Sequence, residues 1–241
     1  MHGAGGNLLA GAYGEVLVAP TPRNRVSHSH LTSARIRLVL ALPRPKALGR
    51  LLPILPTLGV DQVILTGATR VERAYWSAKL LSNPAAIEAL LIQGMEQSTD
   101  TRMPSVLCTK SLRAALALVS GATPPAKLTG FASCTNADLL EQLQQHVPGP
   151  SELWVIAHPG AHRPLSPESL ASQIGGCDGS LPRLTVVIGP EGGWQEQELV
   201  LLKEACGVEG VSLGARVMTT TTAIIATAST ASMMRDIAAS K

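Results

Sequence analysis

Short apolar runs that alternate with helical patterns are the feature that most constrains how this chain can fold. RIRLVLALP (35–43) is an almost unbroken apolar run ended by proline, as expected of a parallel strand buried on both faces. Asn83–Pro84 and Ser166–Pro167 each combine a capping residue with a proline suited to a first helical turn. Further strands are expected at Ala12–Ala19, 61–66, 104–109, 152–158, 183–189 and 210–214. A proline-interrupted helical stretch is expected at 46–58, and further helices at 111–119, 136–146, 195–206 and about 220–237. The alternation predicts an α/β domain with a mostly parallel sheet.

Composition excludes several classes of protein. With 45% hydrophobic and 15% charged residues, the 241-residue chain is not disordered and is long enough to bury a full core. No apolar run reaches the roughly 18–20 residues that span a bilayer, which excludes an integral membrane protein. The four cysteines are too far apart for a disulfide scaffold and indicate a reducing compartment. Because the N-terminus also lacks a secretory signal pattern, we expect a cytoplasmic protein, or an organellar one if its source is eukaryotic.

Three strand ends carry residues suited to a ligand site: WVIAHPGAH (154–162), VVIGPEGGW (186–194) and SLGARVMTTTT (212–222). Open α/β sheets bind ligands outside the carboxyl ends of their strands, so these loops are predicted to form one pocket. The run Gly189–Trp194 lets the backbone approach a ligand closely, yet the chain has no G-K-[S/T] and no GxGxxG phosphate loop. Glu191 would repel a pyrophosphate and favours a cationic or zwitterionic ligand. A plain tight turn is the alternative.

The other two loops offer an arginine and two histidines. Arg216 is the only basic residue between Lys203 and Arg235, and it is suited to orient a phosphate, a carboxylate or a base edge; pairing with a nearby carboxylate is the alternative. His158 and His162 have no Cys, Asp or Glu at ligand spacing, so no metal is predicted. A hydrolytic triad has no support either, because no G-x-S-x-G occurs.

Charge is distributed unevenly along the chain. Residues 1–120 hold 13 Lys and Arg against 6 Asp and Glu (+7), whereas residues 121–241 hold 7 against 11 (−4). The acid-free stretch from Val16 to Val60 fits a polyanion partner, with a solvated basic loop as the alternative. The predicted RNA-contacting residues in this stretch are Arg23, Arg25, Arg35, Arg37 and Arg44.

The last helix is nearly uncharged until Arg235. A helix that is apolar all round is buried, either against another subunit or in the core of its own chain.

The run IGPEGGW…E…L…A…GV…VSLGARV resembles the signature of the RsmE-type 16S ribosomal RNA uridine-N3 methyltransferases of the SPOUT superfamily. LVLALPRPKALGRLL, LGVDQVIL, RVERAYW, EQSTDTRMPSV and VIAHPGA are similar to the corresponding stretches of a bacterial subgroup, so the resemblance covers about residues 35–235. It implies a mostly parallel α/β domain with a deep C-terminal trefoil knot at 35–241, and a homodimer formed through the knot and the last helix. Residues 1–34 would be a truncated remnant of the PUA-like RNA-binding domain of that family.

The resemblance also implies the chemistry. The cofactor would be S-adenosylmethionine, the acceptor N3 of a uridine in small-subunit ribosomal RNA, and Arg216 the residue that orients the acceptor. The positive sulfonium of the cofactor suits Glu191. The cofactor-binding residues would be Ala157, His158, Ile188, Gly189, Glu191, Gly192, Gly193, Leu213, Gly214, Val217 and Met218.

The chain departs from the family pattern at two positions. The family has LGxR-I-L-R-T-E-T-A where this chain has LGARVMTTTTA, so Thr219 replaces an arginine and Thr221 a glutamate. The pKa of uridine N3 lies well above neutral, and threonine supplies no charge to stabilise the anion or remove the proton. A ribosome-associated RNA-binding protein that has lost catalysis is therefore the alternative to the enzyme.

Overall fold

The computed structural model describes residues 36–120, 152–174 and 182–239. The expected strand at Ala12–Ala19, the expected helix at 136–146 and the PUA-like segment 1–34 lie outside the described residues. In the described part, a six-stranded sheet with the order β3-β2-β1-β5-β4-β6 forms the centre, and every pairing is parallel. The strands are β1 (Ile36–Ala41), β2 (Val60–Thr66), β3 (Ser105–Thr109), β4 (Glu152–Ala157), β5 (Arg183–Ile188) and β6 (Gly210–Val211). The predicted parallel α/β sheet is confirmed.

The described helices follow the sequence pattern, with one addition. The helices are α1 (Pro45–Leu51), α2 (Ile54–Thr57), η1 (Arg73–Ser77, a 3-10 helix), α3 (Pro84–Ser98), α4 (Leu112–Ser120), α6 (Pro167–Ile174), α7 (Glu196–Cys206) and α8 (Thr220–Ala239). The proline-interrupted helical stretch expected at 46–58 forms two short helices, because Pro53 interrupts the hydrogen-bonding pattern between them. The helix η1 is not predicted by the sequence. The strand expected at 210–214 is only two residues long, although Ser212 adds an isolated bridge to Pro164.

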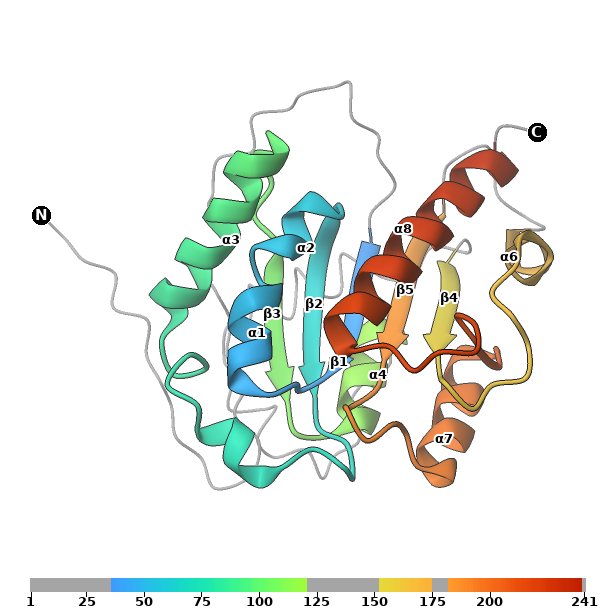
Figure 1. The fold of residues 1–241 in the computed structure, drawn as a ribbon, viewed down its shortest axis with the longest axis horizontal. Coiled ribbons are helices and arrows are strands. Elements are labelled where there is room, and N and C mark those ends of the chain that lie inside the picture. The colour runs from blue at the N-terminus through green and yellow to red at the C-terminus, as the bar shows by residue number, and fades with distance from the viewer. Residues whose placement is uncertain (1–35, 121–151, 175–181, 240–241) are drawn as a thin grey trace, which may run out of the picture.

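Helices cover both faces of the sheet, as Figure 1 shows. Alternate residues of a strand point to opposite faces, so Leu38 packs toward α1, α2, α3, α6 and α8, whereas Val39 packs toward α4 and α7. All six residues of β1 are buried, which explains its continuous apolar run.

The chain changes face between the two central strands. After β1 it continues into α1 and α2 on one face, and after β5 it continues into α7 on the other. The loops therefore diverge at the carboxyl ends of β1 and β5, at the lower end of the sheet in Figure 1. Such a divergence opens space for a ligand in α/β sheets.

The helix α8 is buried on one face only. Ile224, Ala228 and Ala231 pack into the core, whereas Ile225, Met233 and Ile237 remain exposed in the chain as described. Burial on all sides was expected for this helix. Within the described chain, only one of its faces is buried. None of the described helices is both long enough and apolar enough to cross a membrane.

Candidate functional site

The predicted pocket loops meet at one edge of the sheet, because their strands are parallel and neighbouring. The loop after β4 is bound to the loop after β6: the His158 N–H donates to the Val211 carbonyl at 3.0 Å, and the Leu165 N–H donates to the Ser212 carbonyl at 3.0 Å. A Cβ built on Gly193, after β5, would lie 4.0 Å from Cε1 of His158. The structure thus brings the three loops together around His158.

His158 is partly enclosed in this site. Its Nδ1 is buried and has no hydrogen-bond partner among the described residues. Desolvation by burial, and then the nearby positive charge of Arg70, lower the pKa of His158. The neutral imidazole is therefore the favoured form of this residue near neutral pH.

The Gly189–Trp194 loop makes a tight turn after β5. The Gly193 N–H donates to the Pro190 carbonyl at 2.8 Å, and Gly193 has φ +74, a conformation that favours glycine. Gly189 has a different reason to be glycine, because a Cβ there would lie 2.9 Å from Nε1 of the buried Trp194. One of the predicted ligand-contacting glycines is thus also required by the packing of the loop against its own tryptophan.

Arg70 lies across this loop and is not among the predicted site residues. It follows β2, and its Nη1 donates to the carbonyl oxygen of Gly192. A Cβ on Gly193 would lie 3.9 Å from the same Nη1, so Gly193 faces the gap between Arg70 and His158. The signal for Arg70 was present in the sequence: it is a cation shortly after the carboxyl end of a predicted strand, the same rule that located the other loops.

Two carboxylates connect loops on either side of the place where the chain changes face, between β1 and β5. Oε1 of the exposed Glu191 accepts the Arg44 N–H at 3.1 Å, which joins the loops after β5 and β1. Oε1 of Glu198 accepts the Thr69 N–H at 2.7 Å, while its Oε2 accepts the Gln195 N–H at 2.8 Å at the start of α7. These bonds hold the β1 and β2 loops against the Gly189–Trp194 loop.

The loop after β6 is open to solvent. Gly214 has φ +115, and a Cβ built there would meet no atom within 4 Å. Arg216 and Val217 are exposed and Met218 is half-buried. Arg216 forms no ion pair with any described residue, so pairing with a carboxylate, the alternative role for Arg216, has no support there.

Thr219 has a structural role at the start of α8. Thr219 precedes α8, and its Oγ1 accepts the Thr222 N–H at 3.3 Å, which is the bond of an N-cap residue. Position 219 therefore caps the helix that begins directly after the candidate site.

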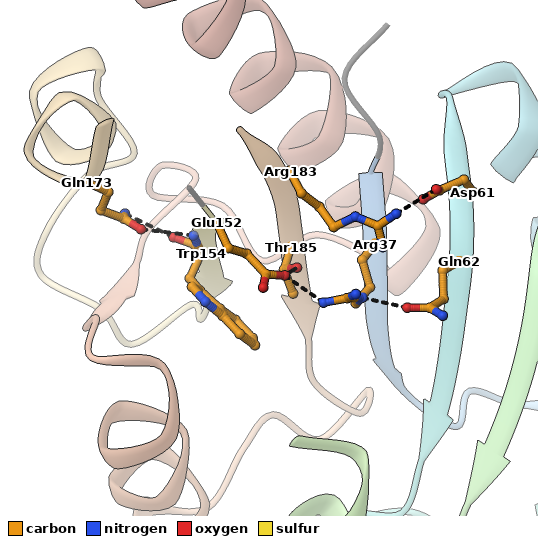
Figure 2. A network of polar contacts seen from close by, with 8 residues as sticks. All are labelled: Arg37, Asp61, Gln62, Glu152, Trp154, Gln173, Arg183 and Thr185. Carbon is orange, nitrogen blue, oxygen red and sulfur yellow. Dashed lines mark hydrogen bonds and ion pairs between the residues drawn. The ribbon is translucent and has the colours of Figure 1, made fainter. Parts of the chain in front are cut away.

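The prediction that Arg37 contacts RNA is wrong. Arg37 is 1% exposed and lies inside the sheet, where its Nη1 pairs with Oε1 of Glu152 at 2.6 Å and its Nε donates to Oε1 of Gln62 at 2.5 Å (Figure 2). A buried and paired guanidinium cannot reach a phosphate. Arg44 is exposed at the carboxyl edge, whereas Arg23, Arg25 and Arg35 lie outside the described residues.

The residues of the site fit a small cationic or zwitterionic ligand such as S-adenosylmethionine. The space next to Gly214 is open, since a Cβ built there would meet no atom within 4 Å. A Cβ built on Gly193 would lie in the gap between Arg70 and His158. Glu191, exposed in the loop after β5, supplies a negative charge. No phosphate-binding loop competes with this interpretation.

Comparison with known proteins agrees with this geometry. A sequence model of the RNA methyltransferase domain matches residues 30–232. The chain is 26% identical over 191 residues to a curated relative from Treponema pallidum, the ribosomal RNA small subunit methyltransferase E. This match covers 79% of the chain and 59% of the relative, so the chain spans about three fifths of that protein's length.

Solved structures show the same fold. The chain resembles the ribosomal RNA small subunit methyltransferase E of Neisseria gonorrhoeae bound to S-adenosyl methionine, with TM-score 0.55, 20% identity, and coverage of 83% of this chain and 66% of that one. It also resembles a methyltransferase of Legionella pneumophila in complex with S-adenosylmethionine, with TM-score 0.56, 19% identity, and coverage of 85% and 67%. From the family match over most of its length, the chain belongs to the RNA methyltransferase domain family, as the resemblance of its GPEGG and LGAR loops predicted.

Proposed function

We propose that this protein is an S-adenosylmethionine-dependent methyltransferase that acts on N3 of a uridine in small-subunit ribosomal RNA. The observation that carries the proposal is the convergence of the loops after β4, β5 and β6 on His158, with Arg70 against the loop after β5. Family membership supports RNA methylation, and the name of the Treponema relative supports the small ribosomal subunit as the source of the substrate.

The cofactor would be held by the loops after β4, β5 and β6. Gly193 and Gly214 leave room for it, backbone groups near Ala157, Ile188 and Leu213 would bind its polar groups, and Glu191 would lie near its positive charge. Met218 and Val217 would add apolar contact from the loop before α8. When bound, S-adenosylmethionine supplies an electrophilic methyl group on a positively charged sulfur.

Arg216 would orient the acceptor. It is an exposed cation on the open loop after β6, and a guanidinium forms paired hydrogen bonds with a phosphate or a base edge. Removal of the N3 proton also needs a group that stabilises the anion, and neither Thr219 nor Thr221 carries charge. With Arg216 alone, methylation is expected to be slow.

A second candidate function is a ribosomal RNA-binding protein without catalysis. The observation that favours it is the role of Thr219, which caps α8 where the family has an arginine. The two candidates share the fold and the RNA partner and differ in turnover.

Other features are proposed by the same resemblance. They are the trefoil knot near the C-terminus and a homodimer through the knot and the exposed face of α8. A PUA-like segment at 1–34 with RNA contacts from Arg23, Arg25 and Arg35, and a cytoplasmic location, complete the set. The exposed Ile225, Met233 and Ile237 support the homodimer, because apolar side chains on one helix face favour burial against a partner.

Calorimetry with S-adenosylmethionine tests the cofactor. We expect binding by the wild type and loss of binding in Gly193→Val, whose side chain would fill the gap between Arg70 and His158. Gly59→Val is the matched control, since Gly59 has the same φ of +74 but lies before β2, at the opposite edge of the sheet. Binding by ATP and none by S-adenosylmethionine would refute the proposed function.

Methylation of small-subunit ribosomal RNA, read by mass spectrometry, separates the enzyme from the RNA-binding alternative. Arg216→Ala should abolish methylation and leave the affinity for S-adenosylmethionine nearly unchanged. The joint variant Thr219→Arg with Thr221→Glu should raise the rate; the two are made together because a lone enclosed charge is costly. An inactive wild type that this variant rescues would favour the non-catalytic protein.

A further inference from the structure

Aromatic side chains and exposed cations gather beside the candidate site. The whole chain has only three Trp, two Tyr and one Phe, yet Tyr75 and Trp76 are adjacent in η1, between β2 and α3. Cations follow the three strands on this side of the sheet: Arg44 after β1, Arg70 and Arg73 after β2, and Lys110 after β3. We call Arg44, Arg70, Arg73, Tyr75, Trp76 and Lys110 the η1 surface.

Contacts join these side chains to one another. Nζ of Lys110 lies 6.0 Å from the centroid of the Trp76 ring, within the range of a cation–π interaction. The nearby Tyr75 hydroxyl raises the pKa of Arg44, and that hydroxyl donates to Oε1 of Glu72 at 3.0 Å. The rings are half-buried and packed against the core.

Charge on this surface is biased toward positive. Its carboxylates, Glu72, Glu191 and Glu198, accept hydrogen bonds from neutral donors and keep their charge, and the four cations outnumber them. Among the described residues, Arg73 and Lys110 form no ion pair. Cations that are not neutralised within the protein attract a polyanion.

The surface is continuous with the candidate site. Arg70 donates to the Gly192 carbonyl, and Arg44 donates its N–H to Glu191, so both belong at once to the η1 surface and to the Gly189–Trp194 loop. A strand of nucleic acid lying on Arg73 and Lys110 would thus lead directly toward the loops that hold the cofactor in the proposed function.

We propose that the η1 surface binds single-stranded RNA next to the acceptor nucleotide, with phosphates on Arg44, Arg73 and Lys110 and an unpaired base against Tyr75 or Trp76. This inference rests on the proposed function and names where its RNA substrate lies. Aromatic rings stack on bases only when these are not enclosed in a duplex, which is why the combination of cations and rings favours a single strand.

Fluorescence anisotropy with a labelled single-stranded RNA of about 12 nucleotides, within the range that single-strand surfaces cover, tests the phosphate contacts. Arg73→Ala with Lys110→Ala should weaken binding by about tenfold or more. The slope of log K against log salt should shrink by about 1.4, since each phosphate contact on a single strand contributes about 0.7. Arg102→Ala is the control, because Arg102 lies before β3, at the opposite end of the strand that Lys110 follows. Unchanged affinity and slope would overturn the proposal.

Substitution of the ring tests stacking. Trp76→Ala should weaken binding of the single strand and leave the salt slope unchanged, while Trp76→Phe should retain most of the affinity. A duplex of the same sequence that binds as tightly as the single strand would refute the stacking contact. Should Trp76→Ala fail to fold, the exposed Arg73 and Lys110 variants still decide the phosphate contacts.

The same proteins are assayed by calorimetry with S-adenosylmethionine. Variants that bind both the cofactor and RNA like the wild type would remove this inference and leave the proposed function intact. A wild type that binds RNA through the η1 surface but does not bind the cofactor would remove the proposed function alone.

Discussion

His158 is the residue on which the candidate site is built. Glycines approach it from two strand ends: a Cβ on Gly160 would lie 2.9 Å from its Nε2, and a Cβ on Gly210 would lie 3.5 Å from its Cβ. This packing partly shields the ring from water, and Arg70 adds a nearby positive charge, so both effects oppose protonation. Because the packing of the loops lowers the pKa of His158, it also makes the stability of the protein depend on pH.

Acidification is expected to destabilise the protein through His158. Its folded-state pKa is lowered, so the unfolded chain binds the proton more readily, and the free energy of unfolding falls as pH decreases through the unfolded value of about 6.5. Urea unfolding between about pH 7.5 and 5.5 should show a shallower decline for His158→Gln than for the wild type. The control is His162→Gln, because His162 lies in the same loop as His158 but is exposed. Equal slopes for wild type and His158→Gln would contradict the expectation.

At the scale of elements, the start of α8 determines the shape of the loop before it. Thr219 caps the helix through the Thr222 N–H, and the loop carrying Arg216 and Gly214 ends at that cap. The first turn of α8 has no acidic residue to interact with its positive end, so the cap is the local interaction that stabilises it.

Removal of the cap should be measurable. Thr219→Ala is expected to lower the free energy of unfolding by about 1 kcal/mol, whereas Thr219→Ser keeps the capping oxygen and should stay close to the wild type. Ser229→Ala, at an exposed position inside α8, is the control and should be neutral or slightly stabilising. Chemical denaturation reads all three. If Thr219→Ala were as stable as the wild type, the cap would have no energetic role.

At the scale of the whole molecule, a polar network ties together the amino ends of the central strands (Figure 2). Arg37 on β1 binds Gln62 on β2 and Glu152 on β4, and the Thr185 hydroxyl on β5 donates to the same Oε1 of Glu152. Desolvation by burial lowers the pKa of Arg37 to about 10, partly opposed by the charge of Glu152, so the arginine stays charged at neutral pH. The network therefore encloses a paired charge at the edge opposite the candidate site.

Breaking the Arg37–Glu152 pair should cost far more than breaking an exposed pair. Glu152→Gln leaves a buried charge without its partner and is expected to lower the free energy of unfolding by about 3–5 kcal/mol. Arg37→Met combined with Glu152→Gln should recover part of this loss. The comparison is Glu209→Gln, which breaks the exposed Lys203–Glu209 pair of the same 2.6 Å length and should cost less than about 1 kcal/mol. Equal costs for the two single variants would show that burial of the pair carries no penalty.

Much of the fold follows from short-range patterns in the sequence. The apolar run at 35–43 gives β1 with every residue buried, and the capping residue Asn83 before Pro84 gives the start of α3. The glycine-bearing loops could be placed at one edge of the sheet because parallel strands end together. These features depend on spacing and on the conformational preferences of neighbouring residues, which the chain carries locally.

Only the tertiary structure decided which side chains meet across the chain. Arg37 belongs to a basic stretch by sequence, yet it is buried because Glu152, 115 residues away, lies within reach of it. Arg70 joins the candidate site because β2 and β5 flank β1, which brings its loop to Gly192. The exposed half of α8 depends on which of its faces β5 and α6 cover. Local pattern determines whether a residue is in a strand, a helix or a loop, whereas burial and pairing depend on contacts between distant segments that form only when the sheet is assembled.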